Sequence, residues 1–494
     1  MAKTPQTLLG FLPDLNPDTP GVMTECRHMI PYEQGFMAAP TPSAANAAAL
    51  AGECRGAKVI TKLDGTRRIF AGTQTKLYEL TGTTWTDRSA GGGSYVGSVD
   101  SRWIYCQFGD TTMATNLADA MQSSTTGAFA AIAGAPRAKV VVSASNNFVI
   151  AFNTVDAGFG TSPDRWWNCA QNDQTNWVPS VASGAASGRL IATPGPIQAA
   201  LPLGDYVIAY KERGIYVGTF VGAAQGSWQW NLAADSALAG AVGAEAVCEI
   251  AGGAHFIVGA DDFWIFDGTS RPLSVGQGIR DWFRLNASQT YLYRAKCAFD
   301  AQRNIVWVSY VSTANTTGAV NDACLAFYLP TRKWGADNFN VEAMLTFTAP
   351  GTTIDGLDAY AATIDTLPAV PFDSAYWLSG ARSFGFFDAT HRLSIKGGTP
   401  ADSGWTTGDM GDDDVLSLLE SVRIRFYEKP TTAQAQHLYA MNEGDALEAG
   451  TTEQIYDGRF EFQLSARWHR LKFDMTGQHK EGSMTPTLSP ESLQ

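Results

Sequence analysis

Apolar and polar residues alternate in short runs along most of the chain, with turn residues between the runs. The clearest case lies between Ala57 and Arg88, where four strand-like runs are separated by turns such as Asp64-Gly65. Asp-Gly readily adopts the positive φ that a two-residue hairpin needs, so successive runs should pair antiparallel. This stretch predicts a four-stranded up-and-down sheet.

The same arrangement returns at 246–275 and again at 376–395. Aligning Gly259–Val275 with Gly380–Ile395, leaving Pro272 unmatched, gives nine identities in sixteen positions, which indicates an internal repeat. Four-stranded repeats spaced by roughly 40 to 50 residues are typical of propeller blades. A lone blade cannot bury both of its faces, whereas radial stacking can, so we expect an irregular β-propeller of six or seven blades.

Helical patterns are scarce in this all-β sequence. The Ala-rich stretch 41–52 is compatible with a short helix, and so are residues 278–285, which follow one of the repeats. We expect these two helices to be minor additions to a sheet-based fold.

Beyond Gly404 the pattern changes to longer alternating runs, as expected for half-buried antiparallel strands. These runs are Val422–Tyr427, Phe460–Leu464 and Trp468–Phe473. We interpret residues 399–414 as a linker and the last dozen residues as a tail. The chain then divides into an N-terminal extended assembly segment (1–56), a propeller with insertions between blades (57–398), and a smaller, acidic, antiparallel β domain with its tail (399–494).

The composition is that of a folded protein. Hydrophobic residues make up 45% and charged residues 17%, a mixture that excludes disorder, collagen and coiled coil. The seven cysteines include no C-x-x-C pair and are expected to be buried thiols of a protein made in a reducing cytoplasm. No run of 18 apolar residues predicts a membrane-spanning helix, and the apolar block Leu8–Leu12 is too short for a signal sequence.

The chain is acidic, with 48 Asp and Glu against 35 Lys and Arg and a formal charge of −13. Residues 401–494 carry 16 of the acids and only 8 of the bases. A protein that grips nucleic acid through its phosphates should be basic, at least on one face. Five of these acids lie close together in the sequence: Asp402, Asp409, Asp412, Asp413 and Asp414.

The sequence offers no catalytic, metal or cofactor motif. None of the six histidines stands at a zinc-ligand spacing, and neither a phosphate-binding glycine loop nor a G-x-S-x-G turn occurs. Propellers often house glycosidases, but adjacent acids such as Asp261 and Asp262 fall in turns, where aspartate usually makes local hydrogen bonds. We therefore expect no enzymatic activity.

Two groups of tryptophans stand apart from the regular strand positions. Packing between blades is the ordinary role for aromatic residues in such strands. These five residues are instead candidates for a surface that contacts a neighbouring subunit: Trp166, Trp167, Trp177, Trp228 and Trp230.

An ordered series of short segments resembles one protein family, the tail nozzle or hub proteins of short-tailed bacteriophages, also called packaged-DNA stabilisation proteins. The matching segments cover most of the first 340 residues, and a closing strand matches near the end. They are Leu15–Pro17, Cys26–Pro31, Cys54–Gly56, Ile69–Thr73, Lys76–Tyr78, Trp103–Asp110, Ala114–Asn116, Gly134–Pro136, Lys211–Tyr216, Phe263–Gly268 and Ala466–Phe473.

The resemblance implies a structural virion protein, assembled in the host cytoplasm into a hexameric ring of the tail. Such a ring lies beneath portal and adaptor proteins, beside tail fibres or spikes and above the host cell surface, and it retains packaged double-stranded DNA and lets it leave. Because each neutralised phosphate adds affinity and therefore friction, an acidic wall suits DNA that must slide without sequence-specific binding. In such a ring Asp402, Asp409, Asp412, Asp413 and Asp414 are candidate lining residues of the channel or its exit; the other explanation is that the surplus acids only keep a large ring soluble. The alternative is a propeller that binds or hydrolyses glycans at the host surface.

Overall fold

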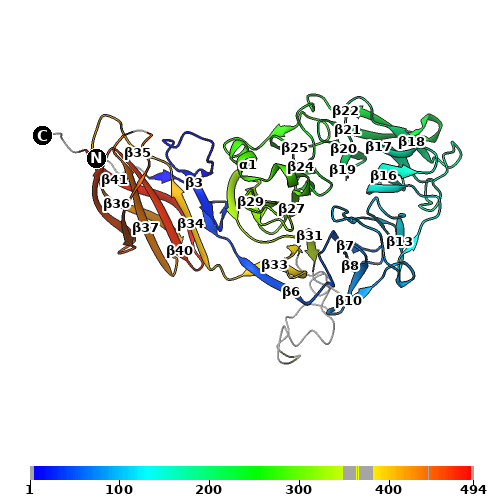
Figure 1. Ribbon diagram of the computed structural model, residues 1–494, viewed down its shortest axis with the longest axis horizontal. Helices are drawn as coiled ribbons and strands as arrows, with labels where there is room; N and C mark the ends of the chain where they lie inside the picture. The colour runs from blue at the N-terminus through cyan, green and yellow to red at the C-terminus, as the bar shows by residue number, and fades with distance from the viewer. Residues whose placement is uncertain (1–4, 349–362, 364, 366–381, 443, 491–494) are drawn as a thin grey trace.

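The computed structural model describes residues 5–348, 363, 365, 382–442 and 444–490. Two β units lie side by side in it, a propeller at the right of Figure 1 and a sandwich at the left. Within the described residues, no helix is long and apolar enough to cross a membrane.

Six separate four-stranded sheets, together with the first four strands of a ten-stranded sheet, form the propeller blades of the described chain. We number the blades along the chain. Blades 1 to 3 comprise β7 (Ala57–Thr61), β8 (Arg67–Gly72), β9 (Leu77–Thr81) and β10 (Thr84–Asp87); β11 (Ile104–Phe108), β12 (Thr111–Thr115), β13 (Gln122–Ser124) and β14 (Ala130–Ala131); and β15 (Arg137–Ala144), β16 (Phe148–Asp156), β17 (Gly160–Asn168) and β18 (Ala186–Arg189).

The remaining blades follow the same meander. Blades 4 to 6 comprise β19 (Ile197–Leu203), β20 (Tyr206–Lys211), β21 (Ile215–Gly222) and β22 (Ser227–Leu232); β23 (Val247–Ile250), β24 (Ala254–Val258), β25 (Phe263–Phe266) and β26 (Leu273–Ser274); and β27 (Lys296–Asp300), β28 (Ile305–Tyr310), β29 (Ala323–Tyr328) and β30 (Lys333–Asp337). Blade 7 comprises β31 (Ala343–Thr348), β32 (Arg382–Phe387), β33 (Arg392–Gly398) and β6 (Thr41–Ala49).

The ring closes through its innermost strands. Each of β7, β11, β15, β19, β23, β27 and β31 contacts the next, and β31 contacts β7 again. The expected propeller of six or seven blades is confirmed, and so is the first meander, in which Gly65 has a φ of 83° at the hairpin between β7 and β8. Buried aromatic side chains fill the space between blades, as where Trp307 stacks on Phe384 with ring centroids 5.5 Å apart.

The outermost strand of blade 7 comes from the N-terminal part of the chain. Residues 41–52 do not form the expected helix, because Thr41–Ala49 pairs antiparallel with β33 instead. Alanine favours a helix only weakly, and an isolated helix of this length is marginal, whereas the unpaired edge of β33 offers a partner. In Figure 1, β6 runs from the sandwich side of the molecule to β33.

The aligned repeat segments occupy different positions in their blades. The segment from Phe263 forms the third and fourth strands of blade 5, whereas the segment from Phe384 forms the second and third strands of blade 7. Their likeness is that of one hairpin to another and not of whole blades. The part of the segment 376–395 before Arg382 lies outside the described residues.

The second expected helix is confirmed as α1 (Arg280–Asn286). The carboxylate of Asp14 accepts hydrogen bonds from the backbone N–H groups of Asp281 (2.7 Å) and Trp282 (2.8 Å). A distant residue thus satisfies two of the free donors in the first turn. Three short 3-10 turns accompany it, η1 (Ala90–Gly92), η2 (Ala223–Gln225) and η3 (Gln289–Arg294).

Two sheets packed face to face form the sandwich. The first continues the ten-stranded sheet through β4 (Met29–Tyr32), β5 (Gly35–Ala38), β41 (Lys480–Pro490), β36 (Ser417–Glu428) and β39 (Arg459–Ala466), with β1 (Gln6–Thr7) on β41. The second comprises β2 (Gly10–Phe11), β3 (Val22–Arg27), β34 (Asp402–Thr407), β40 (Trp468–Thr476), β37 (Thr432–Ala440) and β38 (Glu448–Gln454), with β35 (Met410–Gly411) on β40. Trp405, Leu419, Val422 and Phe473 are among the buried residues between the sheets.

The expected antiparallel C-terminal strands are present, but two neighbouring predictions are wrong. Residues 399–414 are not only a linker, because Asp402–Thr407 forms β34 between β3 and β40. Residues 483–490, the described part of the predicted tail, are not free, because β41 pairs with β36 as far as Pro490. In both cases the pairing strand lies far away in the sequence, so local turn residues gave a misleading signal.

The N-terminal segment 1–56 belongs to both units. Its strands β1 to β5 lie in the sandwich, and β6 lies in blade 7. The ten-stranded sheet connects the units where Ala336 of β30 pairs with Met29 of β4. Propeller and sandwich are thus joined by a continuous sheet and by two passages of the chain.

Candidate functional site

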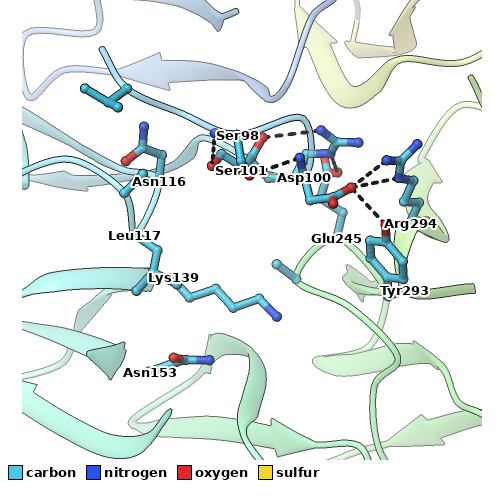
Figure 2. A pocket seen from close by; sticks show the side chains of 14 residues that line it. Ser98, Asp100, Ser101, Asn116, Leu117, Lys139, Asn153, Glu245, Tyr293 and Arg294 are labelled. Carbon is cyan, nitrogen blue, oxygen red and sulfur yellow. Dashed lines mark hydrogen bonds and ion pairs between the residues drawn. The ribbon is translucent and has the colours of Figure 1, made fainter. Parts of the chain in front are cut away.

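A cavity of about 440 Å³ lies where the chain enters several innermost strands of the propeller (Figure 2). Segments far apart in the sequence form its wall. The lining residues come from the connections before β11, β23 and β27, from the connection between β12 and β13, and from β15 and β16 themselves. The cavity therefore opens at one end of the central channel, where a propeller brings many connecting segments together.

The acids of this cavity are each held by cations. Asp100 accepts hydrogen bonds from Arg294 (2.5 Å) and from the Tyr293 hydroxyl (2.8 Å). Burial alone would raise the pKa of Asp100, but these two donors hold it below its ordinary value. Glu245 lies 3.1 Å from the buried Lys296 ammonium and 3.5 Å from Arg102.

Lys139 has a different environment from the other charged groups. It extends into the cavity from β15 (Figure 2), and its ammonium donates a hydrogen bond to Gln198. Burial lowers its pKa to about 8. Among the described residues, no carboxylate forms an ion pair with Lys139, so the cavity contains one cation without an internal counterion.

Two residues of the cavity wall have left-handed backbone. Leu117 has a φ of 66°, and Asn153 has a φ of 55° at a register shift between β16 and β17. The surroundings fix both, since Leu117 N–H donates to Ala138 O (2.8 Å) and Asn153 Nδ2 donates to Ile197 O (3.0 Å). Such conformations cost about 1–3 kcal/mol and are often found near functional sites.

A second hollow lies along the innermost strands. This space of about 500 Å³ is lined by β7, β19, β23, β27 and β31. Lys58 of β7 and Glu249 of β23 face it, among apolar residues such as Val59, Leu201 and Phe299. The Lys58 ammonium donates to Tyr105 O at 3.1 Å, which ties blade 1 to blade 2.

The environment of Asp100 differs from that of a general acid. General acid catalysis needs a carboxyl whose pKa is raised, whereas the pKa of Asp100 is lowered. Burial does raise the pKa of Glu342, which accepts from the Cys54 backbone N–H and contacts His391 between blades 7 and 1. Glu342 does not line the cavity of Figure 2.

The five candidate interface tryptophans are buried or partly buried within the propeller, which corrects the expectation of a surface patch. Trp166 and Trp167 are adjacent on β17 and face opposite sides of blade 3, one toward blade 4 and one toward blade 2. Trp177 and Trp228 are also buried, and the partly buried Trp230 packs 5.8 Å from Trp166. Four of the five expose 9% or less of their surface, too little for contact with another subunit.

The five candidate acids separate into two kinds. Asp402 forms an ion pair with Arg27, and Asp409 accepts two hydrogen bonds from Arg470 (2.8 and 2.9 Å). Asp412, Asp413 and Asp414 form an exposed turn between β35 and β36. Of the five candidates, only Asp412, Asp413 and Asp414 form no ion pair with a described cation.

Sequence reasoning missed the cavity and Lys139. The lining residues range from Val96 to Arg294 and carry no motif, so only the closure of the ring brings them together. A lysine inside the strand Arg137–Ala144, among apolar residues, was the one available local signal.

No protein-family model matches the chain, and no curated protein matches it. Among solved structures, PorZ, a surface component of the type-IX secretion system of Porphyromonas gingivalis, is 10% identical with a TM-score of 0.40, covering 87% of this chain and 58% of PorZ. YCF48 from Cyanidioschyzon merolae is 14% identical with a TM-score of 0.38, covering 63% of this chain and 93% of YCF48. A glycoside hydrolase is 7% identical with a TM-score of 0.25, covering 89% of this chain and 98% of that one. Likenesses this distant bear on neither activity nor partners.

Proposed function

We propose that this chain is a structural protein of a bacteriophage tail, a nozzle or hub subunit that assembles with copies of itself around the DNA channel. The proposal places it in the virion, beneath portal and adaptor proteins and beside fibres or spikes. Its role is to retain packaged DNA and let it pass, without catalysis and without sequence-specific contacts. The hexameric ring comes from the family resemblance.

The observation that carries this proposal is the ten-stranded sheet, which runs from blade 6 through β4 and β5 into the sandwich. β30 of the propeller pairs with β4 of the sandwich at Ala336 and Met29, so bending between the two units would break main-chain hydrogen bonds there. Rigid, elongated subunits suit a tail that must bear the pressure of packaged DNA.

A buried ion cluster lies at the same junction. Asp337, at the end of blade 6, contacts Lys396 of blade 7 (2.6 Å) and His28 of the sandwich (2.7 Å). Asp337 and Lys396 are each 2% exposed. Three parts of the molecule therefore meet at one carboxylate, and separating any of them would leave a buried charge without its partner.

Immunogold labelling of phage particles with an antibody against this chain tests the proposal. The expected label lies at the tail beneath the portal, and particles assembled without the chain should lose their packaged DNA. Particles that carry no label, or that keep their DNA without the chain, would refute it.

The polar cavity of Figure 2 favours the glycan alternative, since Lys139 extends into it without an ion-pair partner among the described residues. A glycan array with the purified chain separates the two functions. Binding that is lost in Lys139→Met would support the glycan function, and an empty array would leave the structural function as the better one.

A further inference from the structure

The outer face of the sandwich contains a basic groove in an otherwise acidic region. Along β36, Val422 and Ile424 point into the core, whereas Arg423 and Arg425 alternate with them and are exposed. These two arginines and the exposed Lys429 line a groove of about 730 Å³ together with Ser483, Thr485 and Asp457. Four of the eight bases of residues 401–494 gather here: Arg423, Arg425, Lys429 and Arg459.

The arrangement of these positive charges destabilises the sheet that carries them. Arg423 of β36 lies directly opposite Arg459 of β39, and like charges facing each other across two strands destabilise a sheet. Arg459 is partly compensated by Asp457 (3.8 Å) and Glu461 (3.7 Å). In the described part of the chain, Arg423, Arg425 and Lys429 form no ion pair. A negative partner from outside the molecule would remove this repulsion.

The acidic turn of Asp412, Asp413 and Asp414 lies beyond the opposite end of the same strand. The carboxylate of Asp413 accepts a hydrogen bond from Trp468 Nε1 (2.8 Å), and that of Asp412 accepts one from the backbone N–H of Asp414 (2.8 Å). Both contacts fix the shape of the turn but leave its negative charge in place. The nearby Arg467 is turned toward Met441 and Asn442, to which it donates.

The two patches cannot neutralise each other within one molecule. Arg425 lies eight residues along β36 from Ser417, where the strand begins after the acidic turn, which amounts to about 26 Å at 3.3 Å per residue. The electrostatic screening length in physiological salt is only about 8 Å. The sandwich is therefore acidic at one end of β36 and basic at the other.

We propose that copies of this chain associate head to tail through the sandwich, with the acidic turn of one copy docked on the basic groove of the next. Such a contact uses two different surfaces on each subunit, so it repeats from copy to copy and forms a ring where the rotation between copies closes. The inference rests on the proposed function, for which it names the contact between subunits. It assigns Asp412, Asp413 and Asp414 to that contact and not to the wall of a DNA channel.

A charge exchange tests the contact. Arg423→Glu with Arg425→Glu reverses the groove, and Asp412→Lys, Asp413→Lys and Asp414→Lys reverse the turn. Each reversed protein alone should associate at least about tenfold more weakly than the parent, measured by analytical ultracentrifugation. A mixture of the two should recover the parent assembly, because every groove then meets a turn of opposite charge. The assembly of the parent should also weaken in 1 M NaCl, where screening is about 3 Å.

Matched controls keep the result interpretable. Arg332→Glu with Arg392→Glu makes the same charge change at exposed positions of the propeller and should leave association unchanged. Neutral Arg423→Gln with Arg425→Gln should weaken association less than reversal does, and unchanged circular dichroism shows that each variant folds.

Three results would overturn the inference: a parent chain that stays monomeric at low salt, reversed variants that assemble like the parent, or a mixture that does not recover. A groove reversal that abolishes binding of duplex DNA while leaving assembly intact would also overturn it and assign the groove to nucleic acid. If rings form despite both reversals, the inference fails and the proposed function stands. If the chain is absent from virions, the proposed function fails regardless of how the chain associates in solution.

Discussion

The ion cluster at the junction of propeller and sandwich offers the sharpest test of their coupling. Replacing Lys396 by Met keeps a side chain of similar length over the Phe339 ring, which lies 4.3 Å from the Lys396 ammonium, but leaves the Asp337 carboxylate buried with only His28 beside it. Burial would raise the pKa of Asp337, whereas His28 and Lys396 hold it below its ordinary value. The ionised carboxylate therefore depends on these partners.

The expected loss follows from the burial of the pair. Removing one partner of a buried ion pair usually costs about 3–5 kcal/mol, because the other charge remains without compensation. Lys396→Met should lower the free energy of unfolding by about that amount, measured by urea denaturation. The double variant Asp337→Asn with Lys396→Met should recover much of the loss, since no uncompensated charge remains.

An exposed ion pair provides the matched control. Arg271 lies 3.0 Å from Asp235, with side chains 80% and 64% exposed, so Arg271→Met should cost less than about 1 kcal/mol. Hydrogen exchange should quicken in β30 and β4 of Lys396→Met and not in the Arg271→Met control. A Lys396→Met protein as stable as the Arg271→Met protein would refute the role of this cluster.

Three further changes test other parts of the structure. Burial raises the pKa of Glu481 from 4.5 to about 8, so the folded protein holds a proton that the unfolded chain releases. The free energy of unfolding should therefore fall by about 5 kcal/mol between pH 4.5 and 8. In urea denaturation, Glu481→Gln should remove this pH dependence, and an equal pH dependence in both proteins would contradict the assignment. Burial lowers the pKa of Lys139 to about 8, so stability should rise above pH 8 until the unfolded lysine also titrates near 10.5, and Lys139→Met should lack this rise. Trp307→Ala should cost about 3–5 kcal/mol by opening a cavity between blades 6 and 7, and a loss under 1 kcal/mol would show that Trp307 does not hold these blades together.

The blades were predictable because neighbouring residues in the sequence determine each of their hairpins. Alternating apolar residues and the Asp64-Gly65 turn define a hairpin wherever it lies in the chain, and the same holds for the segment around Phe263. The number of strands per blade and the closed ring follow from the need to bury both faces of each sheet.

What the sequence concealed depends on pairings between distant segments. The Ala-rich segment 41–49 becomes a strand only because β33 needs a partner, and Asp402–Thr407 becomes one only between β3 and β40. The sequence of β41 likewise predicts a tail, and only its pairing with β36 makes it a strand. Such long-range constraints leave no local pattern.

The candidate site shows the same division. The absence of catalytic motifs was visible in the sequence, but the burial of Trp166 and Trp167 on opposite faces of one strand required the neighbouring blades. The cavity with Lys139 combines connections from almost two hundred residues of chain. The contrast between paired Asp409 and the unpaired turn of Asp412 depends on where Arg470 lies.

Cryo-electron microscopy of the purified chain shows directly whether copies of it form a ring. We expect rings in which each propeller and its sandwich keep the relative position described above, around an opening wide enough for duplex DNA. Single copies that do not assemble, with the sandwich swinging freely from the propeller, would contradict it.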